Sequence, residues 1–212
     1  MLTGRDNPEK VWNFLKSNGF NNFGAAGLMG NLHAESAMQP TNLQNSHERK
    51  LGMNDTEYTA AVDNGTYTNF VKDSAGYGLA QWTYWSRKQA LLNYARQYQK
   101  SIGDLEMQLN YLIKELKQYG LLDKVKNATS VYEASTIILV QFEKPADQSE
   151  NAKKRRAGYG YIYYDRFADP LESDIAILQK HGVINTPAYW QQTAPRVQYL
   201  PELIHNMAEA LK

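Results

Sequence analysis

Apolar residues recur at helical spacing over most of the chain, which predicts a mainly α-helical body. The first helix is expected after Asn7-Pro8, because proline is favoured in the first turn of a helix, and Gly19 is expected to end it. Further helices are predicted over residues 22–38, 85–99, 104–118, 130–143 and 149–167.

The segment 22–38 also carries small residues at spacings of three and four positions. They are Gly24, Gly27, Gly30 and Ala34. A stripe of this kind lets a neighbouring helix approach closely, so we expect tight helix packing along it.

The helical periodicity is lost between Pro40 and about Ala75, where Asn, Thr, Ser, Asp and Gly prevail. We predict a long loop here, with a short hairpin around Asn64-Gly65, because Asn-Gly favours a two-residue turn. Long loops in compact domains are usually functional. The fold is therefore expected to be mainly α with a small irregular or hairpin lobe.

A proline at position 170 marks the expected end of a first domain, residues 1–170. Residues 171–212 are predicted to form a C-terminal helical extension, with helices over 171–180 and 199–211.

Composition narrows the function classes for these 212 residues. Lys and Arg number 23 against 22 Asp and Glu, so no global field attracts nucleic acid or an anionic membrane. The absence of cysteine excludes disulfides, thiolate metal sites and thiol nucleophiles. No apolar run approaches the roughly 20 residues of a membrane span, and the opening six residues contain no signal peptide. Export by another route, or excision from a longer chain, both stay open.

Glu35 is the first candidate for chemistry. Leu28, Leu32 and Glu35 are spaced i, i+4 and i+7, which places the carboxylate within about 40° of an apolar stripe. The residue also lies near the carboxyl end of its helix, where the helix dipole is negative. Desolvation and the dipole are both expected to raise its pKa, as general acid catalysis of glycosidic cleavage requires. The alternative is a Glu that turns to solvent at a helix end.

A second candidate is the stretch Gly76-Tyr77-Gly78-Leu79-Ala80-Gln81-Trp82-Thr83. Its glycines allow a ligand to approach the backbone closely, Gln81 offers both a donor and an acceptor, and Trp82 offers a flat face. This set of groups is typical of sugar binding.

Together these motifs resemble the lysozyme-like superfamily, and in their specific form the phage tail lysozyme family. The resemblance covers residues 8 to about 168 and implies a lysozyme-like α+β fold that cleaves bacterial peptidoglycan glycan strands. It also implies a protein that is virion-associated or acts on the cell wall, with other domains or proteins of a phage tail or secreted assembly as possible partners. The strings that carry it are Glu35-Ser36, the stretch from Gly76 to Thr83, then Trp85, Arg87, Leu91, Leu92 and Tyr94, and Phe142-Glu143-Lys144-Pro145.

The resemblance implies roles for individual residues. Glu35 would be the general acid, and Gln81 would bond the N-acetyl or hydroxyl groups of a sugar. Tyr77 and Trp82 would form cleft walls beside Gly78, although core packing is the alternative for Trp82.

The second carboxylate is the point at which the sequence departs from the pattern. In lysozymes of the chicken type it directly precedes the Tyr-Gly pair, and here that position is Gly76. Asp73, three residues earlier, is the tentative replacement, with Asp55 and Asp63 also in the loop. Glu143 is a tentative member of the site; it either faces the cleft as a second acid or is a helix-end Glu bonded to Arg155 or Arg156. Hydrolysis with a general-base carboxylate, substrate-assisted hydrolysis and formation of a 1,6-anhydro end, the lytic transglycosylase reaction, all stay open.

Other features of the sequence suggest no further chemistry. His33-Ala34-Glu35 resembles a zinc deaminase motif but lacks the cysteine ligands, so we expect no metal and no cofactor. The basic run Lys153-Lys154-Arg155-Arg156 either meets anionic wall polymers or is solvated. A non-catalytic wall-binding or tail structural module is the rival function. A desolvated Glu35 argues against it, because a binder gains nothing from burying a carboxylate.

Overall fold

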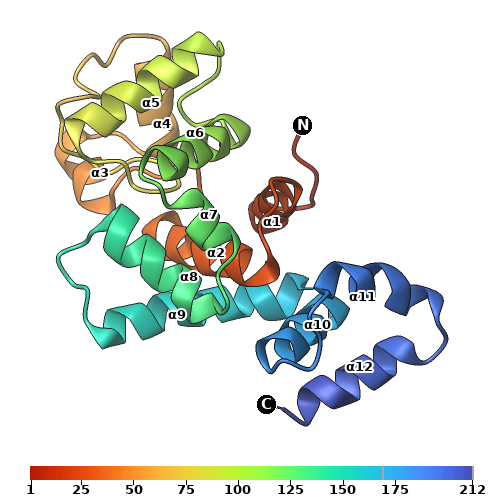
Figure 1. The fold of residues 1–212 in the computed structure, drawn as a ribbon. Coiled ribbons are helices and arrows are strands. Elements are labelled where there is room, and N and C mark those ends of the chain that lie inside the picture. The colour runs from red at the N-terminus through yellow and green to blue at the C-terminus, as the bar shows by residue number, and fades with distance from the viewer. Residues whose placement is uncertain (169, 212) are drawn as a thin grey trace.

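The computed structural model describes residues 1–168 and 170–211, and the regular secondary structure of these residues is helical (Figure 1). Two contiguous helical parts follow one another, a large body and a smaller C-terminal unit. In chain order the helices are α1 (Asn7–Ser17), α2 (Asn22–Ser36), α3 (Asn45–Leu51), α4 (Asp55–Asp63), α5 (Trp85–Gln97), α6 (Leu105–Gln118), α7 (Leu122–Lys126), α8 (Val131–Ile137), η1 (Ile138–Glu143), α9 (Glu150–Phe167), α10 (Pro170–Lys180), α11 (Pro187–Thr193), η2 (Ala194–Arg196) and α12 (Leu200–Glu209).

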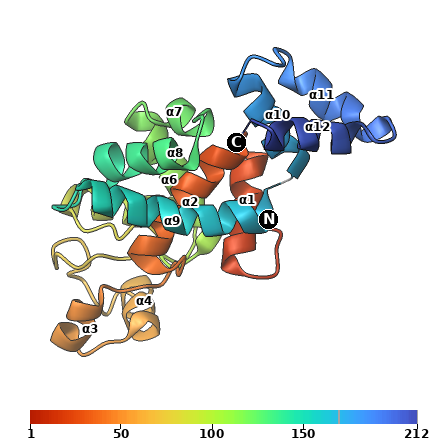
Figure 2. The ribbon, with the colours of Figure 1, turned by 90° about the horizontal axis from the view of Figure 1, so that it is seen from below.

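Helix α2 lies at the centre of the body and is buried along most of its length. It packs chiefly on α9 and α8, which enclose it in both ribbon views (Figure 2). A side chain at Gly30 would overlap the backbone of α9, and one at Gly27 would come within 2.5 Å of Ala134 Cβ on α8. The predicted close approach along the small-residue stripe is therefore confirmed, and it fixes the end of α2 that carries Glu35.

The long loop predicted between Pro40 and Ala75 is wrong in its central part, which forms α3 and α4. Asn54 caps α4 in a capping box, with its side chain accepting from the Glu57 backbone and the Glu57 carboxylate accepting in return. The Asn64-Gly65 pair does not turn a hairpin, because Asn64 caps the end of α4. Short helices fixed by caps lack the length that a periodicity argument needs.

The expected β character of the lobe is also wrong for the part of the chain that the structure describes. Only isolated bridges occur there, between Leu43 and Tyr77 and between Tyr77 and Trp82. The second is a tight turn, since the backbones of Tyr77 and Trp82 exchange hydrogen bonds of 3.2 and 3.0 Å. Because Leu43 and Trp82 pair with the same residue at single positions, no sheet develops, and α3 to α5 build the lobe instead.

The later helices agree with the pattern of the sequence, with two differences. The segment 130–143 is not one regular helix, because α8 passes into the π-helix η1 at Ile138. The helices α7 and α11, of five and seven residues, were not predicted.

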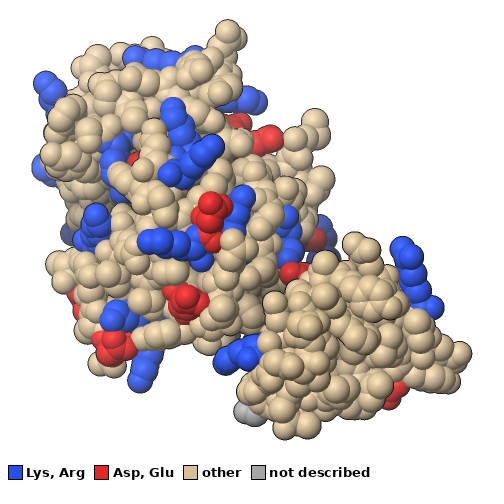
Figure 3. All heavy atoms as spheres, in the orientation of Figure 1, with Lys and Arg blue, Asp and Glu red and all other residues tan. Residues whose placement is uncertain are grey.

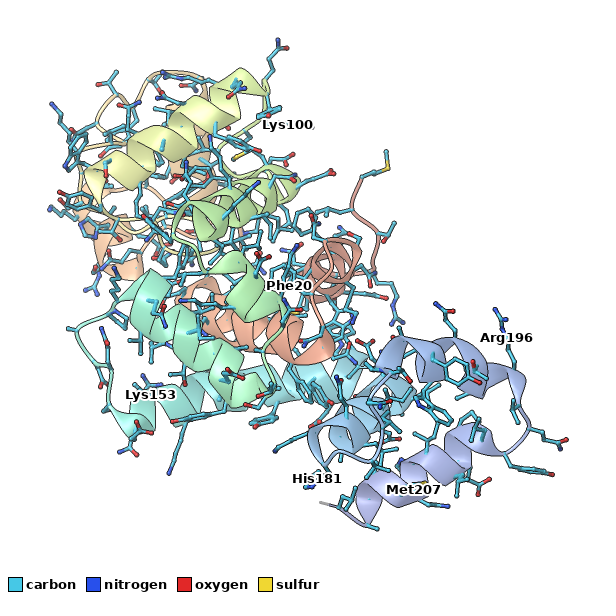
Figure 4. The ribbon with its side chains drawn as sticks, viewed as in Figure 1. Phe20, Lys100, Lys153, His181, Arg196 and Met207 are labelled. Atoms are coloured by element: carbon cyan, nitrogen blue, oxygen red, sulfur yellow. The ribbon has the colours of Figure 1, made fainter. Side chains whose placement is uncertain are left out.

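The C-terminal unit of α10 to α12 has a small hydrophobic core of its own around Ile175, Leu178 and Ile204. Lys16 on α1 binds Glu172 at 2.8 Å and joins the unit to the body. The unit lies at the opposite end of the molecule from the α3–α4 lobe in both ribbon views (Figures 1 and 2). His181 and Met207 mark it in the side-chain view, far from Lys100 beyond α5 (Figure 4). The division at residue 170 stays a prediction.

Charged side chains of both signs are scattered over the body on the face drawn in Figure 3, whereas the C-terminal unit shows few. That face offers no continuous basic patch to a polyanion. Among the described residues, no helix combines the length and the apolar character that crossing a bilayer demands.

Candidate active site

Glu35 lies one residue before the end of α2, at a point where the chain turns sharply. Ala37 and Met38 follow with φ of 49° and 61°, in the left-handed region that costs non-glycine residues about 1 kcal/mol or more each. Ser36 donates a hydrogen bond of 3.0 Å to the carbonyl of Leu79. The turn thus holds Glu35 against the Gly76–Thr83 stretch, as the motif pairing suggested.

A polar pocket of about 440 Å³ opens beside this turn. It gathers side chains from the end of α2, from the Gly76–Thr83 stretch, from α5 and from η1. The lining residues are Glu35, Gln44, Gln81, Thr83, Tyr84, Arg87, Glu143 and Pro145.

Arg156 of α9 is the charged partner of Glu35. The two side chains form an ion pair of 2.5 Å, with 10% of the Arg156 side chain and 18% of the Glu35 side chain exposed. Arg156 also donates to Asn31 Oδ1 at 3.3 Å, and Asn31 donates to Ser135 Oγ on α8 at 3.0 Å. The expectation of an apolar setting for Glu35 is corrected, because the sequence argument did not include this guanidinium.

Glu143 enters the same pocket from the last residue of η1. Its Oε1 is buried and has no hydrogen-bond partner among the described residues. Burial first, and then the negative charge of Glu35, raise the pKa of Glu143 to about 8, against the opposing charges of Arg87 and Arg156. A carboxyl group of this kind is neutral at pH 7 and can hold a proton for catalysis.

The backbone at Glu143 is as unusual as its carboxyl group. A π-helix is rare and often marks a functional position, and Lys144 ends it with φ of 51°. The extra residue of the π turn places Glu143 at the pocket. The sequence left two interpretations of Glu143 open, a second acid in the cleft or a helix-end residue bonded to an arginine. The reading in which Arg155 or Arg156 bonds Glu143 is not supported, because Arg156 pairs with Glu35.

Arg87 lines the pocket together with Glu143, and it forms an ion pair with Glu115. Arg87 donates two hydrogen bonds of 2.9 Å to the two carboxylate oxygens. Trp82 donates its indole N–H to Glu115 at 2.6 Å, and Tyr111 donates at 3.2 Å. Because every lone pair of Glu115 faces a donor, this carboxylate is a structural group.

The predicted sugar-binding residues separate into two sets. Gln81 lines the pocket, and its Nε2 donates to Asn42 Oδ1 at 2.9 Å. Tyr77 and Trp82 are fully buried and leave no face for a sugar, so in this structure they pack rather than form cleft walls. Gly78 adopts φ of 74° with Gln108 packed against it, and it is not a lining residue of the pocket. Its carbonyl accepts a hydrogen bond of 3.2 Å from Gln81 Nε2, so it holds the Gln81 side chain in place.

Asp73 is not brought to the pocket with Glu35. It is buried, and it accepts from Lys88 Nζ at 2.6 Å and from the Tyr58 hydroxyl at 2.5 Å. The other loop candidates are similarly engaged: Asp55 accepts from the backbone of Leu43, and Asp63 accepts from Ser101. The structure therefore joins Glu35 with Glu143 and leaves the three Asp residues as anchors of the lobe.

Comparison with known families identifies the family to which the body of the chain belongs. The family model described as phage tail lysozyme matches residues 6–167, the whole of the body. The chain belongs to the phage tail lysozyme family. Membership implies cleavage of peptidoglycan by a virion-associated protein that acts on the cell wall, and the matched region contains every residue of the pocket.

The basic run and the C-terminal unit contain charged groups that lie outside the pocket lining. In the basic run, Lys153 pairs with Glu150 at 2.6 Å, and Arg156 pairs with Glu35. In the C-terminal unit, Asp174, His205 and Glu209 have ligand atoms within 4.8 Å of one another, although the sequence suggested no metal spacing. Asp174 and His205 already contact each other at 2.9 Å, so we interpret this group as a hydrogen-bonded cluster.

Sequence reasoning missed Gln44, Arg87 and Tyr84 as lining residues, and Arg156 as the partner of Glu35. Nothing in the sequence marked Gln44 as a lining residue, because it lies in the segment for which a long loop is predicted. Arg87 and Tyr84 flank the start of α5. They follow the Gly76–Thr83 stretch closely in the sequence, and this closeness could have indicated that they line the same pocket.

Proposed function

We propose that this protein hydrolyses the β-1,4 bond between N-acetylmuramic acid and N-acetylglucosamine in peptidoglycan, with Glu35 as the general acid. The observation that carries the proposal is that Glu35 and Glu143 line one pocket and that Glu143 favours its neutral form. Two carboxyl groups that share a site avoid double ionisation, so the pair retains one proton at neutral pH.

The two carboxyl groups differ in their access to a substrate. Glu35 is partly exposed to the pocket, whereas Glu143 Oε1 has no accessible surface. Glu35 is therefore the group that reaches the glycosidic oxygen, and Glu143 holds the proton of the resting pair. Arg156 stabilises the charge that Glu35 carries before it takes up that proton and after it gives it away.

The proton balance of the reaction follows from this pair. The proton first moves from Glu143 to Glu35; as the glycosidic bond breaks, Glu35 gives it to the departing oxygen, and both carboxyl groups are then ionised. Water then attacks the anomeric carbon and gives a proton back to the pair. Gln81 Nε2 already donates to Asn42, so its Oε1 is the atom that can accept a hydrogen bond from a sugar hydroxyl or N–H. Gln44 Oε1 accepts from the Gly76 backbone, so its Nε2 is the atom that can donate to a sugar oxygen.

The test is digestion of purified peptidoglycan with the wild type and with Glu35→Gln, followed by mass spectrometry of the released muropeptides. Reducing muramic ends from the wild type alone are expected. Products that are lighter by one water would show that the 6-hydroxyl of the sugar, and not water, attacks the anomeric carbon. The reaction would then be that of a lytic transglycosylase. Release of nothing from several wall types would overturn cleavage in favour of a wall-binding or tail structural module.

A further inference from the structure

A second hollow, of about 780 Å³, adjoins the carboxylate pocket. The two share Thr83 and Tyr84 as lining residues, so they lie side by side. We call this hollow the side trough. Its lining residues are Val71, Lys72, Ser74, Thr83, Tyr84 and Trp85.

Two aromatic rings dominate the side trough. Tyr84 is 64% exposed and Trp85 is 55% exposed, which is unusual for such large side chains. Their ring centroids are 6.1 Å apart and their planes are inclined by 44°. Trp85 is the first residue of α5 and Tyr84 is its cap, so both rings stand on a rigid element. Fixed, exposed aromatic faces are suited to the apolar faces of sugar rings.

The lining of the side trough also includes a cation, Lys72. Lys72 is exposed and forms no ion pair with any described residue. The backbone next to it is held from below, because Lys88 binds both Asp73 Oδ1 at 2.6 Å and the carbonyl of Ala75 at 2.8 Å. The buried ion pair thus fixes the backbone from Lys72 to Ala75. Asp73 therefore has a structural role outside the carboxylate pocket.

We propose that the side trough binds the continuation of the peptidoglycan strand, with sugar rings stacked on Tyr84 and Trp85 and a stem-peptide carboxylate paired with Lys72. The proposal rests on the proposed function, and it deepens it by naming the part of the substrate that is recognised. Adjacency to the carboxylate pocket points to the occupant, since a strand whose scissile bond lies at Glu35 extends beyond that pocket and Tyr84 lines both hollows. The stem peptide supplies the anionic group that matches Lys72.

The test measures binding without turnover, in a Glu35→Gln background, by sedimentation with purified sacculi. Trp85→Ala is expected to weaken binding about two- to tenfold, the range for loss of one aromatic contact. Tyr161→Ala is the matched control, because Tyr161 is an exposed ring on α9 outside the side trough. Lys72→Gln is expected to weaken binding to intact sacculi but not to glycan strands from which an amidase has removed the peptides, and Lys117→Gln on α6 is its control.

The outcomes separate this proposal from the proposed function. Equal binding by Trp85→Ala and Tyr161→Ala would overturn the side trough as a glycan site, even if the wild type cleaves peptidoglycan. Binding that depends on Trp85, in a protein whose wild type cleaves nothing, would support the side trough and remove the catalytic assignment. Absence of binding by the Glu35→Gln protein to any sacculi would overturn the side trough.

Discussion

Arg156 and Glu35 form an ion pair of 2.5 Å across the packing of α9 on α2. The pair places a positive charge next to the pocket that Glu35 shares with Glu143, and this charge acts on the Glu143 carboxyl group. Arg156 lowers the pKa of Glu143, whereas Glu35 raises it, so the proton affinity of the pocket depends on both residues.

Replacement of Arg156 by Met should therefore change the pH dependence of cleavage. Without the guanidinium, the pKa of Glu143 rises further above 8, and the alkaline limb of the activity profile should move to higher pH. Arg156→Lys retains the charge and should move it much less. Rates of turbidity loss on sacculi between pH 5 and 10 measure the effect. An unchanged alkaline limb in Arg156→Met would contradict the electrostatic link.

Replacement of Glu143 by Gln should move the alkaline limb in the other direction. The variant lacks the carboxyl group whose pKa is about 8, so the alkaline limb that this group sets should move to lower pH. We expect little loss of activity at the new optimum. If the profile of Glu143→Gln coincides with that of the wild type, Glu143 does not hold the proton.

Glu143 should also affect the stability of the protein. Its folded pKa of about 8 lies above the ordinary value of 4.5, so folding favours the protonated form. Its contribution is full below about pH 4.5, decreases as the pH rises, and is lost above about 8. Thermal unfolding should show a Tm difference between Glu143→Gln and the wild type that grows in favour of the variant across this window. A difference independent of pH would contradict burial of the carboxyl group.

The buried pair of Lys88 and Asp73 gives a prediction about the role of Asp73. Lys88→Met leaves the Asp73 carboxylate without its cation and should cost about 3–5 kcal/mol of unfolding free energy. Asp73→Asn in the same chain removes the unpaired charge and should restore part of that loss. The double variant should still cleave peptidoglycan at a temperature where it is folded. Complete loss of cleavage by a folded double variant would instead make Asp73 the second carboxylate.

The helical body and the position of Glu35 could be predicted from the sequence because both depend on local signals. Leu105 to Leu116 repeat with the period of a helix, and Glu35 follows an apolar stripe toward a helix end. The phage tail lysozyme resemblance depended on such local strings and was confirmed. The sequence did not predict α4, because polar residues surround it and obscure its helical periodicity. Asn54 and Glu57, which form its capping box, were the local signal for this helix.

The partners of the site residues could not be predicted, because they come from distant parts of the chain. Arg156 meets Glu35 only because α9 packs along the small residues of α2. Trp82 is buried rather than exposed in a cleft because Glu115 on α6 accepts its indole N–H. Periodicity determines which face of a helix is apolar, but it does not determine which helix covers that face.

Two glycines on the α2–α9 pair provide a matched test of the packing that brings Arg156 to Glu35. A Cβ at Gly30 would overlap the α9 backbone at Arg156 and lie 2.6 Å from the backbone N of Gly160, whereas a Cβ at Gly158 meets nothing within 4 Å. Gly30→Ala should therefore destabilise the protein by about 1–3 kcal/mol through overpacking.

Gly158→Ala, inside the same helix α9, should be neutral or stabilising by up to about 1 kcal/mol, because alanine is the better helix former. Denaturant unfolding measures both changes, and sacculus digestion below the unfolding temperature measures activity. Gly30→Ala should also lose activity, since separation of α9 from α2 pulls Arg156 away from Glu35. Equal stability of the two variants would mean that α9 can move away from Gly30 without cost, and the small-residue stripe would then not set the geometry of the pocket.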